Sequence, residues 1–219
     1  MKGRFKMTRL ILIRHGESIA NSKDMFAGHL DIDLHQNGEK QAELTAKFVV
    51  ENFKVDKIYS SDLKRAYYTA KALADILNMD VEKNEGLREI AAGKWDGMVF
   101  KDIMNTYKED YLLWLNDIGN ARCTDGESVV HLGERIMKTL TEIAEKNDGK
   151  TVAIATHATP IRVSKTIIDY GKVDEMKNIP WPSNAAVSVY EYTDGKWNCP
   201  MYGEDKHLKD LVTVLPGNV

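Results

Sequence analysis

The sequence predicts an α/β protein: a three-layer sandwich with a mostly parallel central sheet, helices on both faces and a small helical cap insertion. Two observations predict this fold. Several short runs of aliphatic and β-branched residues are continuously apolar, which is typical of parallel strands covered on both faces. Segments with apolar residues at helical spacing lie between these runs. Strands and helices therefore alternate, and crossover connections must join the strands.

Four runs are expected to form strands. Residues 10–13, 57–59 and 151–156 are continuously apolar or nearly so and are placed inside the sheet. Residues 186–192 alternate between apolar and polar side chains, so this strand is placed at or near an edge. The tail from Pro200 onward is expected to form a peripheral strand or arm.

Three helices follow from the apolar spacing. One covers residues 62–77, and another carries apolar residues at positions 42, 46, 49 and 53. A third starts near Ser128, whose hydroxyl is a suitable N-cap. Residues 91–126 contain no strand-like run, and we expect a largely helical cap over the active edge of the sheet. Residues 1–219 are expected to form a single domain that includes this cap.

Residue composition narrows the classes of function. The 219 residues carry a net charge of −3, whereas a binder of nucleic-acid phosphates needs a cationic excess, so no nucleic-acid partner is expected. No apolar run is long enough for a membrane span or a signal-peptide core, so no membrane partner is expected. Cys123 and Cys199 are far apart and lack metal-ligand spacing, which favours a reduced, cytoplasmic protein.

Two histidines follow directly on predicted strands. Arg14 and His15 come after the first strand, and His157 comes after strand 151–156 at the start of a helix that has Pro160 as an early residue. Ligands of α/β sheets bind outside the carboxyl ends of strands, and helix N-termini favour anions. Taken singly, the first histidine is better explained as a capping residue beside a solvated arginine, and the second has the alternative of a satisfied core residue. Two of them at neighbouring strand ends indicate an anion site.

Arg65 and Glu89 are further candidates. Arg65 lies in the first turn of its predicted helix, where the dipole disfavours a cation. It is therefore either an anion ligand or a partner of Asp62 or another nearby acid. Glu89 lies in a loop; a nearby phosphate favours the protonated form of a carboxyl group, so Glu89 is a candidate general acid. An ordinary exposed loop glutamate is the alternative.

These segments resemble the histidine phosphatase superfamily, which includes the cofactor-dependent phosphoglycerate mutases. The resemblance is carried, in order along the chain, by Arg14-His15-Gly16-Glu17, by Ser-Asp-Leu-x-Arg-Ala around Arg65, by Glu89 with Gly-x-Trp-x-Gly behind it, and by His157. It extends from residue 10 to about residue 190. It implies that His15 is a nucleophile that forms a phosphohistidine, without a metal or other cofactor.

The resemblance also implies roles for the other residues. Arg14, Arg65 and His157 would hold the phosphoryl oxygens, and Glu89 would protonate the leaving oxygen and then accept a proton from water. His15 would need a neutral attacking nitrogen, with its other nitrogen held by a neighbour such as a backbone carbonyl. Gly16 would bring the backbone close to the ligand. Further phosphate- or substrate-binding candidates are Asn21, Gly28 and Ala158, which stands where the family commonly has glycine.

Departures from the mutase pattern favour a phosphomonoesterase acting on a small-molecule phosphate ester. Mutases usually continue from the acidic residue with Arg-His-Tyr and keep a cluster of arginines in the insertion. Here Ile90 follows Glu89, and the insertion offers only Arg122. A mutase stays the main alternative. A metal hydrolase using His15 and His157 lacks a carboxylate pair or a His-x-x-x-His spacing. A non-catalytic phosphate-binding module is a further alternative.

Some features of the sequence are left without a functional role. Glu127 belongs to a Gly-Glu-Ser stretch that echoes the family but serves equally as a helix start. The aromatic residues of the insertion are assigned to its own packing. The substrate's identity and the oligomeric state stay open. Surface or capping positions are expected for the remaining histidines, with His29 able to line the substrate mouth; they are His29, His35, His131 and His207.

Overall fold

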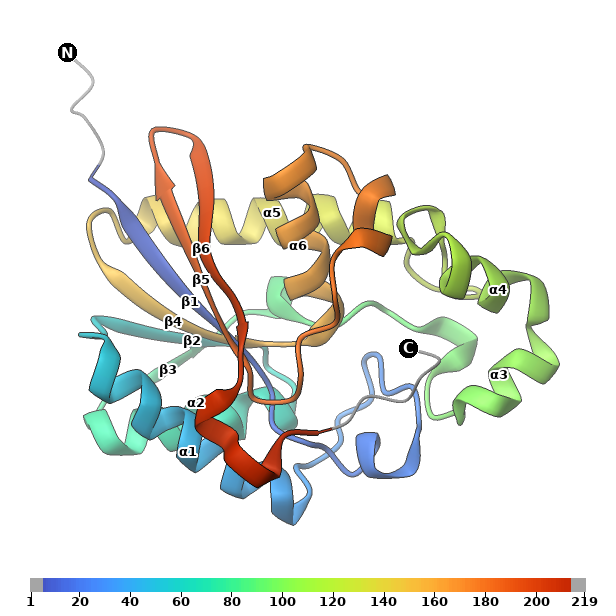
Figure 1. Ribbon diagram of the computed structural model, residues 1–219, viewed down its shortest axis with the longest axis horizontal. Helices are drawn as coiled ribbons and strands as arrows, with labels where there is room; N and C mark the ends of the chain where they lie inside the picture. The colour runs from blue at the N-terminus through green and yellow to red at the C-terminus, as the bar shows by residue number, and fades with distance from the viewer. Residues whose placement is uncertain (1–5, 214–219) are drawn as a thin grey trace.

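The computed structural model describes residues 6–213 and shows the predicted α/β sandwich (Figure 1). Within these residues a six-stranded sheet has the order β3-β2-β4-β1-β5-β6. Strands β1 to β4 run parallel; β5 pairs antiparallel with β1, and β6 pairs antiparallel with β5 at the edge. Helices α1 and α2 cover one face of the sheet, and α5 and α6 cover the other (Figure 1).

The boundaries of the elements are as follows. The strands are β1 Thr8–Arg14, β2 Lys57–Ser60, β3 Val81–Lys83, β4 Thr151–Thr156, β5 Val187–Thr193 and β6 Lys196–Glu204. The α-helices are α1 Gln36–Asn52, α2 Lys64–Leu77, α3 Phe100–Thr106, α4 Lys108–Asn116, α5 Val129–Lys146 and α6 Ala158–Tyr170. Short 3-10 helices lie at Asn21–Lys23, Glu85–Leu87, Gly93–Trp95, Ile118–Asn120, Asp174–Asn178 and Lys206–Leu211.

The elements expected from the apolar runs and helical spacing are confirmed. Ser128 caps α5 as predicted, because its Oγ accepts a hydrogen bond from the backbone N–H of His131 at 3.2 Å. The alternating run at 186–192 forms β5, which lies one strand in from the edge because β6 forms the edge itself. Strand β3 was not expected, since two of its residues are partly buried, the third is exposed and they carry no apolar run.

The strand register brings the predicted chemistry to one edge of the sheet. β1 and β4 are parallel neighbours with Arg14 beside Thr156, and β2 pairs with β4 so that Ser60 lies beside Ala155. The residues that follow these strands therefore leave the sheet at the same edge. They include His15 after β1 and His157 after β4.

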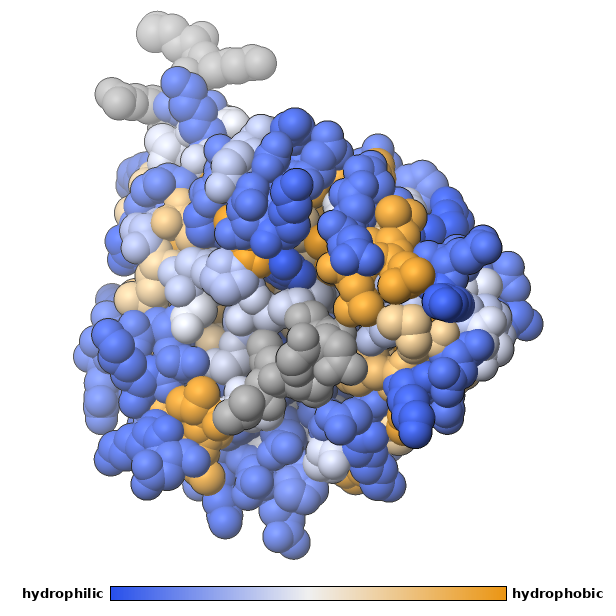
Figure 2. All heavy atoms as spheres, turned by 45° about the vertical axis from the view of Figure 1, so that its right-hand side comes forward, coloured by the Kyte–Doolittle hydropathy of each residue, from blue (hydrophilic) through white to orange (hydrophobic). Residues whose placement is uncertain are grey.

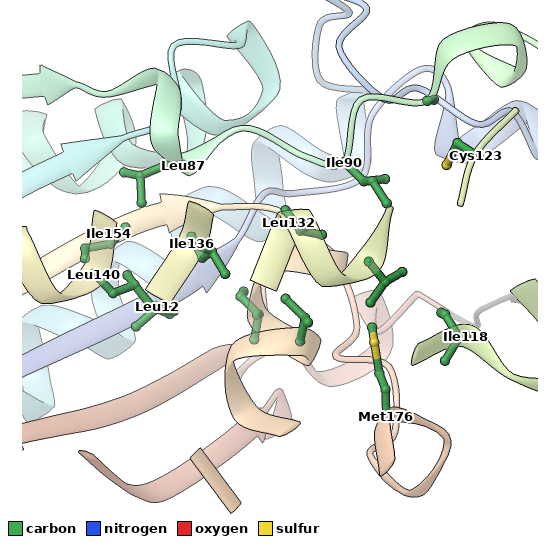
Figure 3. Packing of buried hydrophobic residues seen from close by; sticks show 14 of the residues in the cluster. Leu12, Leu87, Ile90, Ile118, Cys123, Leu132, Ile136, Leu140, Ile154 and Met176 are labelled. Atoms are coloured by element: carbon green, nitrogen blue, oxygen red, sulfur yellow. The ribbon is translucent and has the colours of Figure 1, made fainter. Parts of the chain in front are cut away.

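Side chains of β1 divide between two hydrophobic clusters, because successive residues of a strand face opposite ways. Ile11 and Ile13 pack toward α1 and α2. Figure 3 shows the other cluster, in which Leu12 and Ile154 lie against Leu132, Ile136 and Leu140 of α5.

The segment 91–126 shares the core of the sheet. It holds α3, α4 and two 3-10 helices, so the expectation of a largely helical segment is confirmed. Ile118 and Cys123 of this segment belong to the same cluster as Leu12, toward the right of Figure 3. That the segment acts as a cap on a single domain stays a prediction, and the ends of that domain, residues 1–5 and 214–219, lie outside the described residues.

The face of the molecule in Figure 2 is mostly hydrophilic, with hydrophobic side chains gathered in a few separate patches. Among residues 6–213, no helix combines the length and the apolar character that crossing a bilayer requires.

Candidate active site

His15 is buried at the carboxyl end of β1, and hydrogen bonds to its backbone N–H and carbonyl hold it in place. Its backbone N–H donates to Thr156 O at 2.9 Å, and its carbonyl accepts from Asn184 Nδ2 at 3.1 Å. The Nδ1 atom lies 2.7 Å from Gly16 O. A carbonyl oxygen can only accept, so Nδ1 carries the proton and Nε2 carries the lone pair. The expected carbonyl partner is therefore present, and Nε2 carries a free lone pair in the neutral ring.

The second histidine lies directly against the first. The ring centroids of His15 and His157 are 5.1 Å apart, with the planes at 64°. His157 is fully buried and its Nε2 lies 2.9 Å from Ser61 Oγ, while its Nδ1 has no hydrogen-bond partner among the described residues. The register of β1 and β4 thus brings the two imidazoles together as the sequence predicts. A direct contact of His157 with a phosphoryl group stays a prediction.

Arg14 and Arg65 are almost completely buried beside the histidines. Arg14 Nη1 donates to Pro182 O at 2.6 Å, and Arg65 donates to Gly28 O and Leu30 O, both at 2.7 Å. The Nε–H of each has no partner among the described residues. Burial lowers the pKa of both guanidiniums to about 10, so both stay charged at neutral pH. Two buried cations with donor capacity left over are suited to an anion.

Asp62 is not the partner of Arg65. Asp62 accepts instead from Arg88, whose Nε lies 2.7 Å from its Oδ1. The Arg65 side chain points away from this pair to the Gly28 and Leu30 carbonyls.

Glu89 is not an exposed loop residue, because only 9% of its surface is accessible. Its Oε1 accepts from the Ile90 N–H at 2.8 Å and its Oε2 from the Thr159 N–H at 3.3 Å, in the first turn of α6. The carboxylate opposes the lowering of the pKa of Arg14 and Arg65 that burial causes, which places it within Coulombic range of both. A proton donor or acceptor is thus held beside the cations.

These side chains surround a cavity of about 260 Å³. We call the Arg14 and Arg65 side chains that line it the cationic floor. Its four aromatic lining residues, here called the aromatic wall, are Phe26, Phe100, Trp114 and Trp181. The described lining residues are Arg14, His15, Glu17, Ser18, Asn21, Ser22, Asp24, Met25, Phe26, Ala27, Gly28, Arg65, Glu89, Phe100, Trp114, Ala158, Thr159, Trp181, Asn184 and Thr213.

The aromatic wall is packed from segments far apart in the chain. Phe26 meets Trp114 edge to face at 5.4 Å, and Trp114 stacks on Trp181 at 6.2 Å. The Arg162 guanidinium lies over the Trp181 ring, 4.2 Å from its centroid. Assigning the insertion's aromatic residues to internal packing is correct for the buried Trp95 but incomplete for Trp114, which also lines the cavity.

The secondary candidates Asn21, Gly28 and Ala158 all line the cavity. Asn21 Oδ1 accepts from the Ser18 backbone and hydroxyl at 3.0 and 2.8 Å, so this oxygen is used within the loop. Gly28 has a φ of +39° and its carbonyl holds Arg65; a Cβ there would overlap Asp96. Ala158 opens α6.

Gly16 makes a close backbone approach to the start of α1, because a Cβ on Gly16 would overlap the Gly38 carbonyl. Its approach to a ligand stays a prediction. Its N–H donates to Thr69 Oγ1 at 3.0 Å, and that hydroxyl donates to Arg65 O at 2.8 Å. Gly16 therefore ties the loop after His15 to the helix that carries Arg65.

Sequence reasoning missed Asn184 and Arg135. Asn184 joins His15 O to Asn21 Oδ1, and a single asparagine in a loop gives no signal of this. Arg135 of α5 donates to the Glu89 carbonyl at 3.0 Å. Its partner Glu127 was a usable signal, since the stretch around Glu127 echoed the family and was set aside as a helix start.

The remaining histidines differ in their surroundings. His35 caps α1, as expected, by accepting from the Asn37 N–H at 3.4 Å. His29 Nε2 lies 2.8 Å from Glu89 O, next to the site. The surface or capping role is wrong for His207, which is half-buried, lies 2.8 Å from Thr45 Oγ1 and stacks on Phe48. Within residues 6–213, no three His, Cys, Asp or Glu side chains are grouped to hold a metal ion.

The buried imidazoles predict a pH dependence of folding. Burial, followed by the charges of Arg65 and Arg14, lowers the pKa of His15 well below 6.5, and burial does the same for His157. Below pH 6.5 these two histidines bind protons in the unfolded chain but not in the folded chain. The free energy of unfolding therefore falls as pH falls. The slope approaches about 1.4 kcal/mol per pH unit for each histidine.

Urea unfolding between pH 7 and pH 5 measures this slope. His15→Asn should make the slope shallower by up to one proton, whereas His207, whose pKa burial also lowers, contributes equally to both proteins. Equal slopes for the wild type and the variant would show that the folded His15 ring is protonated.

Comparisons with known proteins find a matching family model, curated relatives and a solved structure of similar fold. The family model described as "Histidine phosphatase superfamily (branch 1)" matches residues 10–205. Phosphoserine phosphatase 1 of Hydrogenobacter thermophilus is 36% identical over 156 residues, which cover 71% of this chain and 74% of that protein. Phosphoglycerate mutase-like protein 4 of Arabidopsis thaliana is 29% identical over 95% of this chain and 90% of its own length. The solved structure of Bacillus stearothermophilus YhfR, 24% identical, has the same fold, with a TM-score of 0.87 over 92% of this chain and all of that one.

Proposed function

This chain belongs to the histidine phosphatase superfamily, and from that premise we propose that it is a phosphomonoesterase in which His15 takes a phosphoryl group from a small phosphate ester and passes it to water. The observation that carries the proposal is the His15 Nε2 lone pair in a buried hollow beside two guanidiniums. Phosphoryl transfer depends mainly on positioning and on neutralising the charge of the oxygens.

The reaction has two balanced steps. His15 Nε2 attacks phosphorus, the bond from phosphorus to the alcohol oxygen breaks, and protonated Glu89 gives its proton to that oxygen. Water then attacks the phosphohistidine, the N–P bond breaks, and Glu89 accepts the proton of the attacking water. Arg14 and Arg65 neutralise the phosphoryl oxygens throughout, and the Gly16 carbonyl stabilises the positive charge on the His15 ring through Nδ1–H.

The cavity supports hydrolysis over the mutase alternative. Arg14 and Arg65 are the only Lys or Arg side chains among its described lining residues, and both belong to the phosphate end. A phosphoglycerate mutase must also hold a carboxylate of its substrate, but Glu17 and Asp24 line the cavity and would repel one. The aromatic wall fits an apolar or cationic leaving group. We therefore place a phosphate monoester without a second acidic group as the preferred substrate.

Hydrolysis of a matched panel tests the proposal. In the presence of a chelator the wild-type protein should release phosphate from p-nitrophenyl phosphate, benzyl phosphate and phosphoethanolamine. Phosphoethanolamine differs from phosphoserine by one carboxylate, and its kcat/KM should be about tenfold higher, which corresponds to ~1.4 kcal/mol of repulsion.

Three outcomes would count against parts of this proposal. No phosphate release from any ester would defeat the phosphatase assignment. Bisphosphate-dependent conversion of one phosphoglycerate isomer to the other, faster than hydrolysis, would establish the mutase. A preference for phosphoserine would leave the phosphatase assignment intact and overturn the substrate class.

A further inference from the structure

Arg135 of α5 reaches over to the loop that carries Glu89. Its Nη1 donates to Gly86 O at 2.9 Å and to Arg88 O at 3.0 Å, and its Nη2 donates to Glu89 O at 3.0 Å. One guanidinium thus satisfies three carbonyls within four consecutive residues. A lysine has a single point of attachment and could not span them.

Arg135 is itself held in one orientation by Glu127. Arg135 Nε lies 2.9 Å from Oε1 and Nη2 lies 2.8 Å from Oε2, which is a bidentate ion pair. The two side chains are only 26% and 15% exposed. Glu127 Oε2 also accepts from the Ala91 N–H at 3.1 Å. The pair therefore grips the loop on both sides of Glu89.

We infer that Arg135, held by Glu127, is a positioning residue for proton transfer by Glu89; this rests on the proposed function. Glu89 Oε1 is fixed by the N–H of Ile90, which lies inside the gripped segment. A shift of that segment moves the carboxyl group away from the leaving oxygen. A misplacement of about 1 Å in a reacting group can cost on the order of 100-fold in rate.

The dependence on the leaving group separates positioning from a general structural role. An alkyl phosphate such as benzyl phosphate needs a proton on its leaving oxygen, whereas p-nitrophenolate departs without one. Arg135→Lys should lower kcat/KM for benzyl phosphate by about 100-fold and for p-nitrophenyl phosphate by only a few fold. Glu89→Gln should show the same pattern, and combining the two changes should add little further loss for benzyl phosphate.

Arg88→Lys is the matched control. Arg88 comes from the same loop and is 27% exposed, but its guanidinium pairs with Asp62. This variant should leave the ratio of the two kcat/KM values at its wild-type level. Glu127→Gln keeps the shape of the second residue while removing its charge. It should lower kcat/KM more for benzyl phosphate than for p-nitrophenyl phosphate. Glu127→Gln therefore provides the test if Arg135→Lys does not fold.

Equal losses for both esters in the Arg135 and Glu127 variants would overturn the inference and assign the pair to fold stability alone. That result is distinct from failure of the proposed function. The latter would appear as absent turnover of both esters by the wild-type protein.

Discussion

His15→Ala is expected to lower kcat for p-nitrophenyl phosphate by a factor between about 10⁴ and 10⁶, as removal of the nucleophile does in other enzymes with covalent catalysis. The structure offers no substitute in the same place. The His157 ring lies 5.1 Å away but is fully buried, with Nε2 engaged by Ser61. Initial rates of the purified proteins measure the loss.

A rapid-quench experiment with ³²P-labelled substrate gives the covalent evidence. Wild-type protein stopped in alkali should retain label on an alkali-stable, acid-labile adduct, and His15→Ala should retain none. His131→Ala, an exposed change on α5, is the control and should behave as the wild type. Label on the His15→Ala protein, or turnover near the wild-type rate, would contradict the nucleophilic role.

Arg65→Ala should lower kcat/KM by about 10³-fold, a loss in the range seen when an arginine that neutralises phosphoryl charge is removed. Arg65 is 1% exposed, so its charge acts through little intervening water. Its donors to Gly28 and Leu30 also fix the loop at the cavity edge. Arg65→Lys keeps the positive charge but lacks the planar guanidinium. Its kcat/KM should therefore lie between those of Arg65→Ala and the wild type.

Inhibition by vanadate shows whether Arg65→Ala loses activity because it binds the charge of the transition state less well or because the loop at the cavity edge is displaced. The inhibition constant should rise in Arg65→Ala roughly in step with the loss of kcat/KM. Arg122→Ala, an exposed arginine of the insertion, should change neither quantity. Unchanged vanadate affinity in Arg65→Ala would show that the phosphoryl group binds elsewhere.

The sequence predicted the parts of the site that depend on local pattern. Continuous apolar runs end at His15 and His157, and parallel pairing of the two strands is enough to bring these residues together. Arg135 was missed because its role depends on contacts with carbonyls 46 to 49 positions away. No periodicity in α5 encodes such contacts, since the helix pattern reports only its apolar face.

Edge strands and loop contacts were only partly predictable, because they also depend on residues that are distant in the sequence. β6 alternates between exposed and partly buried positions only in its first six residues, and only its C-terminal half, from Pro200, was expected as a peripheral strand or arm. His207 is half-buried because Phe48 of α1 stacks on it, and that partner lies far away in the sequence. Distant pairings of this kind leave no spacing signal.

The cationic floor and the aromatic wall come from different parts of the chain. The floor is attached to the central strand and to the start of α2, whereas the wall comes from the 26–28 loop, α3, α4 and the turn at Trp181. Arg65 donates to the loop that carries Phe26, and Arg14 donates to Pro182 next to Trp181, so these two wall positions are tied to the floor. Mutations of Phe100 and Trp114 can therefore exchange one leaving group for another with the least disturbance of the atoms that handle phosphorus. Proteins built on this scaffold can therefore differ in substrate preference while keeping the same phosphoryl-transfer chemistry.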